Sequence, residues 1–173
     1  MVFWTSLLLV AYTYMGYPLL VWFMAGVKHH IPVSINSICD WPTVTLIIPV
    51  FNECARIPGK IANIDLLDYP RDRLQILFVS DGSTDGTAEQ IARYPAVGLI
   101  AYHERKGKPH ALNVAVQQAT GQVLVFSDAR QDIGSEALKY LVANLQDAGI
   151  GAVSGELVHR EPGTLAAANI GLY

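Results

Sequence analysis

The sequence predicts an α/β fold, in which helices cover both faces of a mostly parallel sheet and one transmembrane helix precedes the sheet. Residues 1–27 contain no charged side chain, and an uncharged helix of that length is typical of a membrane span. From residue 43 onward, apolar runs alternate with segments of helical periodicity. This alternation predicts parallel strands joined by right-handed helical crossovers, and therefore a three-layer α/β/α domain.

The amino-terminal segment is long enough to span a bilayer with some tilt. A helix of 27 residues is about 40 Å long, whereas the hydrocarbon core of a bilayer is about 30 Å thick. Trp4 and Trp22 are spaced to reach the two interfaces, and the segment lacks the basic start of a cleavable signal peptide. Lys28 follows the segment and no basic side chain precedes it, so the rest of the chain is expected on the cytoplasmic side of an inner or plasma membrane.

Composition limits the classes of partner and site. The formal net charge is −3, which gives no electrostatic reason to expect a nucleic-acid partner. The two cysteines, Cys39 and Cys54, have neither zinc-ligand spacing nor the number needed for a disulfide framework. Residues 28–42 contain two prolines and few periodic apolar positions, which predicts a linker ahead of a domain over residues 43–173.

Within that domain, strands and helices are predicted from their periodicity and end signals. Ser135 is expected to cap the last complete helix, and residues 165–173 are expected to begin another. Strands are predicted over residues 44–50, 74–79, 97–102, 123–127 and 150–154, and helices over residues 56–67, 84–94, 108–119 and 135–147.

Polar side chains follow several of the predicted strands at their carboxyl ends. In an open parallel sheet these ends meet at one edge, where ligands bind. Carboxylates together with lysines at such an edge are suited to a nucleotide site that binds a metal or recognises a base. The side chains concerned are Asn52, Glu53, Asp81 and Asp128 after strands, and Lys106 and Lys108 in a connection.

The stretch that begins at Asp81 allows two interpretations. Asp81 and Gly82 have the chemistry of a tight turn, and Ser83 or Thr84 could cap the next helix, with Asp85 in its first turn. Asp81 is then either a ligand-binding acid or an acid that serves only the turn and the cap. The chain lacks the phosphate-binding loop of ATPases, the dinucleotide-binding glycine pattern and the nucleophile elbow of hydrolases.

Four motifs, in this order, make the chain resemble family 2 glycosyltransferases. They are Pro-Val-Phe-Asn-Glu at residues 49–53, Ser-Asp-Gly-Ser-Thr-Asp-Gly-Thr at 80–87, Lys-Gly-Lys with Ala-Leu-Asn at 106–113, and Phe-Ser-Asp-Ala at 126–129. The resemblance implies a GT-A fold and a nucleotide-diphosphate sugar donor, with a UDP-sugar expected. The apolar anchor resembles the membrane-bound, polysaccharide-making branch of the family.

The resemblance also implies roles for particular side chains. Pro49, Phe51 and Glu53 would line the nucleoside pocket. Asp81 would accept a hydrogen bond from the edge of the base. Lys108 would lie near the diphosphate, where a cation offsets the charge of the leaving group.

The metal motif departs from the family pattern. Asp128 is the first acid of the Asp-x-Asp motif, which holds Mg²⁺ or Mn²⁺ in this family, but Arg130 stands at the second acid. Asp128 alone could hold the metal, Asp132 could substitute for the missing acid, or Arg130 could itself neutralise the diphosphate. We expect one of the first two, because a metal-free site would not need Asp128.

The expected function is glycosyl transfer to a glycan or lipid acceptor at the cytoplasmic membrane face, in cell-surface polysaccharide or glycolipid synthesis. The resemblance places the catalytic base beyond Tyr173, so the chain is interpreted as an amino-terminal, donor-binding portion. One alternative is a nucleotidyltransferase, although the expected glycine-rich basic loop after the first strand is absent. The other is a membrane-tethered fragment that binds a nucleotide and catalyses nothing.

Overall fold

The computed structural model describes residues 2–27, 35, 38 and 40–158. The chain divides into two compact units, Met1–Pro32 and Val33–Tyr173, and each is described separately. Most of the predicted linker and the helix predicted for residues 165–173 lie outside the described residues. The boundaries proposed for the linker and the domain therefore stay predictions.

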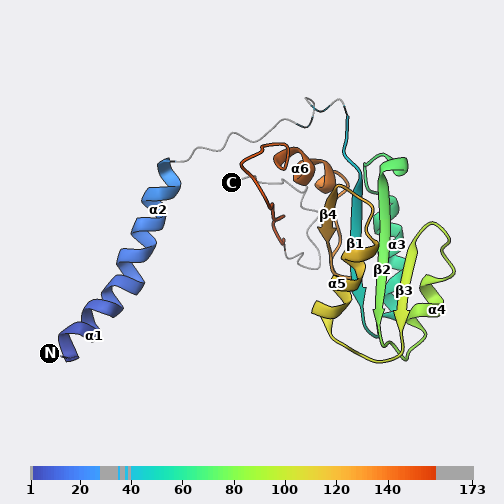
Figure 1. The fold of residues 1–173 in the computed structure, drawn as a ribbon, viewed down its shortest axis with the longest axis horizontal. Helices are drawn as coiled ribbons and strands as arrows, with labels where there is room; N and C mark the ends of the chain where they lie inside the picture. Colours follow the sequence, from blue (N-terminus) through green and yellow to red (C-terminus); the bar gives the residue numbers. More distant parts are fainter. Residues whose placement is uncertain (1, 28–34, 36–37, 39, 159–173) are drawn as a thin grey trace, which may run out of the picture. The chain divides into compact units, whose positions relative to one another are not determined.

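The described residues of the first unit form one continuous helix (Figure 1). It consists of α1 (Val2–Ala11), a π-helical turn (Tyr12–Gly16) and α2 (Tyr17–Val27). The segment Val2–Met24 is long and apolar enough to cross a membrane, and none of it is buried within the structure. The hydroxyls of Thr5, Ser6 and Thr13 donate hydrogen bonds to carbonyls of the preceding turn.

The second unit is built on a parallel sheet of four strands in the order β3-β2-β1-β4. The strands are β1 (Val44–Val50), β2 (Leu74–Asp81), β3 (Gly98–Tyr102) and β4 (Val123–Phe126). Every pairing is parallel, which confirms the prediction made from the alternation of strands and helices. Residues 44–48 of β1 are fully buried, because β1 is a central strand covered on both faces.

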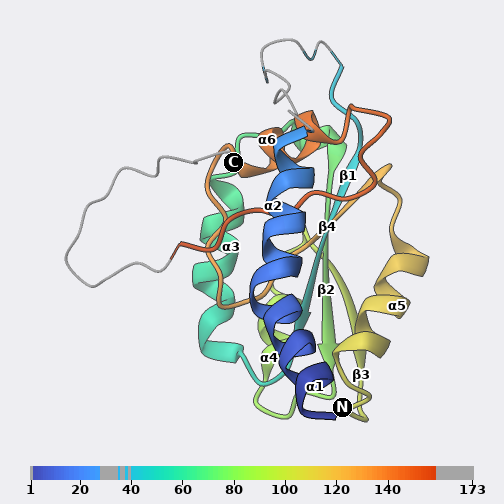
Figure 2. The same cartoon turned by 90° about the vertical axis from the view of Figure 1, so that its left-hand side faces the viewer.

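Helices cover both faces of the sheet, so the predicted three layers are confirmed (Figure 2). On one face, α3 (Ile57–Asp65), α4 (Thr87–Ile91) and α6 (Ala137–Asn144) form a core with alternate residues of β1 and β2, such as Leu46, Ile48 and Phe78. On the other face, α5 (Lys108–Gln118) places Ala111 and Ala115 against Ile47, Leu77 and Val79. The two cores hold the strands in register, and with them the loops at the carboxyl ends of the strands.

The fifth predicted strand is wrong. Residues 150–154 are not in a strand, and β4 is the edge strand of the described sheet. The side chain of Asp147 accepts a hydrogen bond from the amide of Gly149, and its carbonyl accepts one from Ile150, so the chain turns here. Among the described residues, the short apolar run after this turn forms no ladder pairing with β4 or with any other strand.

Two predicted helix caps are also wrong, since α4 and α6 both begin without a capping hydrogen bond from a side chain at the N-cap. Helix α4 begins only at Thr87, whose amide donates to the Asp85 carboxylate at 3.1 Å. The Ser83 hydroxyl instead accepts a bond from the backbone of the loop after β1. The carbonyl of Ser135 accepts a bond from the amide of Asp68, and α6 begins at Ala137 without a side-chain cap.

Candidate functional site

A cavity of about 310 Å³ lies at the edge of the sheet where the strands have their carboxyl ends. Its size lies at the lower end of the range of roughly 300–1,000 Å³ that is typical of small-molecule sites. The side chains that line it come from the ends of β1 and β2 and from the segments after β3 and β4. They are Pro49, Val50, Phe51, Glu53, Asp81, Arg105, Lys108, Asp128, Ala129 and Arg130.

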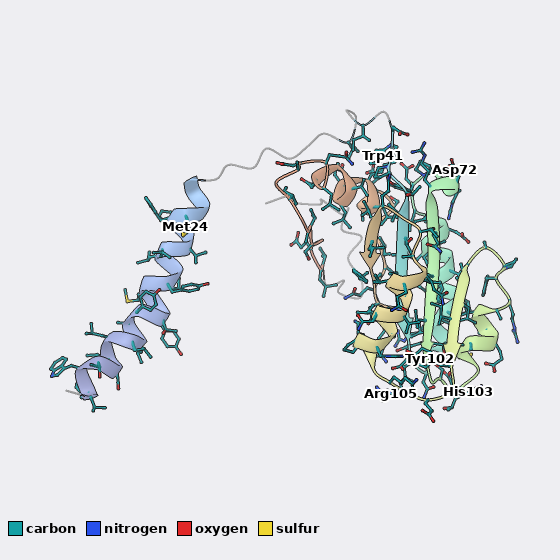
Figure 3. The ribbon with its side chains drawn as sticks, in the orientation of Figure 1. Met24, Trp41, Asp72, Tyr102, His103 and Arg105 are labelled. Atoms are coloured by element: carbon teal, nitrogen blue, oxygen red, sulfur yellow. The ribbon has the colours of Figure 1, made fainter. Side chains whose placement is uncertain are left out.

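All six residues predicted to bind a nucleotide sugar line this one cavity. The side-chain view shows the same polarity of the sheet (Figure 3). Tyr102 and Arg105, at and after the end of β3, lie at one end of the domain, and Trp41 and Asp72, which precede strands, lie at the other. The structure thus brings together residues that are far apart in the sequence.

Asp81 is the last residue of β2, and its side chain fastens the loop after β3 to the sheet. Its Oδ1 accepts a hydrogen bond from the amide of Lys106 at 2.7 Å, and its Oδ2 accepts one from the amide of Gly107 at 2.8 Å. Each carboxylate oxygen has a second lone pair, so the group can still accept a bond from a ligand. Burial, and then the charge of Asp81, raise the pKa of the neighbouring Tyr102 to about 12.

Gly82 allows this close approach of the two loops. Its φ of +69° lies in the left-handed region that favours glycine. A Cβ at this position would lie 2.6 Å from the backbone nitrogen of Arg105, where no side chain fits. The Asp-Gly pair therefore serves the tight turn that the sequence predicts and also the docking of a distant loop.

The loop after β1 is joined to the loop after β2 by its own hydrogen bonds. Asn52, with a φ of +52°, accepts a bond from the amide of Thr84 at 2.9 Å. The amide of Glu53 donates to the hydroxyl of Thr87 at 2.9 Å, and the amide of Cys54 donates to the Asp85 carboxylate at 3.0 Å. The polar residues of the 80–87 motif, apart from Asp81, therefore shape the site without lining the cavity.

Phe51 and Glu53, which were predicted to line the nucleoside pocket, are each in contact with an arginine that was not predicted there. The guanidinium carbon of Arg105 lies 3.9 Å from the centroid of the Phe51 ring, a cation–π arrangement. Glu53 is paired with Arg130, Nε to Oε1 at 2.6 Å, and with Arg56, Nε to Oε2 at 3.0 Å. The carboxylate of Glu53 is therefore neutralised within the protein, and it holds Arg130 at the cavity wall.

Asp128 presents an acid to the cavity. Its Oδ1 accepts a hydrogen bond from the amide of Arg130 at 2.9 Å, and its Oδ2 lies 3.9 Å from the Lys108 ammonium. The side chain is 41% exposed, so it can take a ligand. Mg²⁺ is commonly bound through one or two carboxylates together with substrate phosphates, so a single acid at this wall fits a divalent cation held jointly with a diphosphate.

Other candidate metal ligands receive less support. Asp132 is exposed and is not among the residues that line the cavity. Within the described part of the chain, no three acidic, histidine or cysteine side chains gather into a group that could hold a metal by themselves. Asp128 is therefore the residue through which this site would contact a cation.

Lys60 was missed by the sequence analysis and lies beneath the Asp128 loop. It is 2% exposed, and its ammonium donates to the Ser127 hydroxyl at 3.0 Å and to the Gln131 carbonyl at 2.6 Å. Burial lowers the pKa of Lys60 to about 8, and the nearby charges of Asp132 and Asp128 act in the opposite direction. The signal was available, because Lys60 interrupts the apolar face of its helix next to Ile61.

A parallel sheet with a polar cavity at the carboxyl ends of its strands defines an open α/β domain, and this edge is where such domains bind their ligands. Comparison with known families makes the assignment more specific. The sequence model described as "Glycosyl transferase family 2" matches residues 45–169, and the chain belongs to this family.

Relatives of known name support the same assignment. The chain is 31% identical over 132 residues to glycosyltransferase AglE of Haloferax volcanii, a match that covers 72% of this chain and 43% of the relative. It is 29% identical over 116 residues to the poly-beta-1,6-N-acetyl-D-glucosamine synthase of Staphylococcus aureus, which covers 65% of this chain and 28% of that enzyme.

Solved structures show the same fold. The mannosyltransferase PcManGT of Pyrobaculum calidifontis, in complex with GDP-Man and Mn²⁺, matches with a TM-score of 0.69 and 34% identity over 83% of this chain and 44% of its own. S. aureus TarS 1-349 in complex with UDP-GlcNAc matches with a TM-score of 0.51 and 28% identity over 56% of this chain and 29% of its own. The chain spans less than half the length of each of these relatives.

Proposed function

We propose that this chain is the donor-binding part of a membrane-anchored glycosyltransferase that moves a sugar from a nucleotide-diphosphate donor to a glycan or lipid acceptor. The observation that carries the proposal is the single cavity lined by all six residues that the family motifs implicate. Family membership favours glycosyl transfer over the nucleotidyltransferase alternative. The product would belong to cell-surface polysaccharide or glycolipid synthesis.

The nucleoside would occupy the end of the cavity near Phe51 and Asp81. Asp81 retains lone pairs with which to accept a hydrogen bond from the base, while its bonds to Lys106 and Gly107 fix the direction of the carboxylate. Phe51 offers an aromatic surface that Arg105 already covers on one side. These contacts would hold the donor by its nucleotide.

The diphosphate would lie between Lys108, Arg130 and Asp128. In the transfer step the bond between the sugar and the diphosphate breaks, and negative charge develops on the departing nucleotide. The ammonium of Lys108 and the guanidinium of Arg130 can offset that charge, because both belong to the cavity wall. Asp128 would hold Mg²⁺ or Mn²⁺, which supplies further charge stabilisation of the leaving group when it is bound.

Calorimetric titration of the full chain in detergent tests this proposal. UDP, GDP, ADP, UDP-GlcNAc and GDP-Man would be titrated with Mn²⁺ and with a chelator. We expect one nucleotide to bind more tightly than the others, and we expect this nucleotide to be UDP. Its affinity should fall when the chelator replaces Mn²⁺. If a folded chain binds none of these nucleotides under either condition, the proposal is wrong. Binding of a nucleotide sugar without transfer of the sugar to any acceptor would support the non-catalytic alternative.

We also propose that the first unit anchors the chain in an inner or plasma membrane, with the second unit on the cytoplasmic side. The proposal rests on the uncharged segment Val2–Met24. After alkaline carbonate extraction, the full chain is expected in the membrane pellet. A matched variant with Val10→Arg and Met15→Arg, on either side of the centre of the segment, should move to the supernatant, because each arginine at the centre of a span is costly. Release of the unsubstituted chain would contradict the anchor.

A further inference from the structure

The buried lysine of α3 has no role in the proposed contacts with the donor, yet it lies directly under the segment that carries Asp128. We propose that Lys60 is a positioning residue, which clasps residues 127–131 from beneath so that the Asp128 carboxylate faces the donor cavity. The inference rests on the proposed function, since it deepens the role of the same site. Lys60 itself does not line the cavity.

The clasp holds the segment on both sides of Asp128. The Lys60 ammonium donates to the hydroxyl of Ser127, immediately before Asp128, at 3.0 Å. It also donates to the carbonyl of Gln131, three residues after Asp128, at 2.6 Å. An ammonium has three donors, and two of them are used on this one segment. The bond to Gln131 holds the backbone of the segment directly, and the bond to Ser127 holds it through the side-chain hydroxyl.

The burial of Lys60 indicates that these bonds matter. The side chain lies among the buried Ile57, Ile61 and Ile64 on the sheet-facing side of α3, where an apolar residue would pack without any cost of removing a charge from water. A buried ammonium is tolerated when it is hydrogen-bonded and close to opposite charges. Here the hydrogen bonds and the opposite charges both come from residues 127–132. This segment therefore stabilises the buried ammonium, and the ammonium in turn holds the segment in place.

The rest of the segment is held by contacts that do not use the Asp128 carboxylate. Arg130 is anchored to Glu53 at the cavity wall. One turn further along α3, Asn63 donates to the carbonyl of Ile133 at 2.9 Å and accepts from its amide at 2.9 Å. Like Lys60, Asn63 joins α3 to the loop after β4 with two hydrogen bonds, but it does so at Ile133, which follows Asp128 by five residues. This makes Asn63 a matched control for Lys60.

The test compares Lys60→Met with Asn63→Leu in the full chain in detergent. Amide hydrogen exchange of the ligand-free protein reports the position of the loop without any dependence on donor binding. We expect Lys60→Met to speed exchange over residues 128–131 and to weaken Mn²⁺-dependent nucleotide binding about 10- to 100-fold, as is typical for a residue that orients a metal ligand. Asn63→Leu should speed exchange at Ile133 and leave binding unchanged.

The outcomes separate this inference from the proposed function. Exchange and binding in Lys60→Met equal to those of the unsubstituted chain would overturn the inference, and so would equal losses of binding in both variants. If the unsubstituted chain binds no nucleotide, the proposed function fails, and the exchange comparison alone decides whether Lys60 positions the loop. If Lys60→Met does not fold, Ser127→Ala removes one of the two acceptors and should shift exchange and binding in the same direction by a smaller factor.

Discussion

Replacement of Asp128 by asparagine is expected to weaken Mn²⁺-dependent binding of the nucleotide donor about 100-fold, which corresponds to roughly 3 kcal/mol. The amide oxygen of asparagine can still accept the bond that Asp128 accepts from the amide of Arg130, so the local turn is preserved. The negative charge is lost, however, and a neutral amide is a poor ligand for a divalent cation. Calorimetric titration with Mn²⁺ and with a chelator measures the effect.

Asp132→Asn is the matched control, because Asp132 lies on the same loop but does not line the cavity. It should leave binding unchanged. If Asp132→Asn weakens binding as much as Asp128→Asn does, the metal is held by both acids and Asp132 replaces the missing acid of the motif. If the Asp128 variant binds donor as tightly as the unsubstituted chain, the metal assignment is wrong and neutralisation by Arg130 is favoured.

Asp81→Asn is expected to lose both nucleotide binding and stability. One carboxylate oxygen becomes an amide that cannot accept a bond, so the amide of Lys106 or of Gly107 loses its partner. Loss of one such bond to a charged group costs roughly 2 kcal/mol of folding free energy. Because the same loop forms the cavity wall with Arg105, we expect donor affinity to fall about 100-fold, or roughly 3 kcal/mol.

Asp85→Asn provides the matched comparison for Asp81. Asp85 also accepts backbone bonds from two segments, at Cys54 and Thr87, but it does not line the cavity. Thermal unfolding should show a smaller loss of stability in Asp85→Asn, because Asp85 is exposed and Asp81 is buried, and calorimetry should show loss of binding only in Asp81→Asn. Unchanged binding by a folded Asp81→Asn chain would leave Asp81 with a purely structural role.

The pairing of Glu53 with Arg130 bears on the unusual metal motif. The carboxylate of Glu53 is neutralised by Arg130 and Arg56, which leaves Asp128 as the acid of the cavity wall that is neither buried nor doubly paired. Arg130, at the position of the missing acid, is held at this wall with 65% of its side chain exposed. The site therefore combines one acid for a cation with two cations, Lys108 and Arg130, for the diphosphate.

Local sequence patterns determined the four strands of the sheet, most of the helices and the edge at which the cavity forms. Buried parallel strands read as continuous apolar runs because both faces are covered, as residues 44–48 illustrate. Once the strands are known, their carboxyl ends must meet at one edge, and the acids that follow them must gather there. For this reason Asp81 and Asp128 could be placed at the site without a structure.

Only the tertiary structure decided how these groups are held. The bond from Lys106 to Asp81 joins residues 25 positions apart, and the bond from Lys60 to Ser127 joins residues 67 positions apart. The local capping preference of Ser83 lost to a contact of this kind, since its hydroxyl accepts a bond from the amide of Asn52, 31 positions away. Hydrophobic periodicity indicates which face of a helix or strand is buried. It does not indicate which polar group from a distant part of the chain is buried against that face. Such polar groups determine the direction of the functional side chains, as the amides of Lys106 and Gly107 do for Asp81.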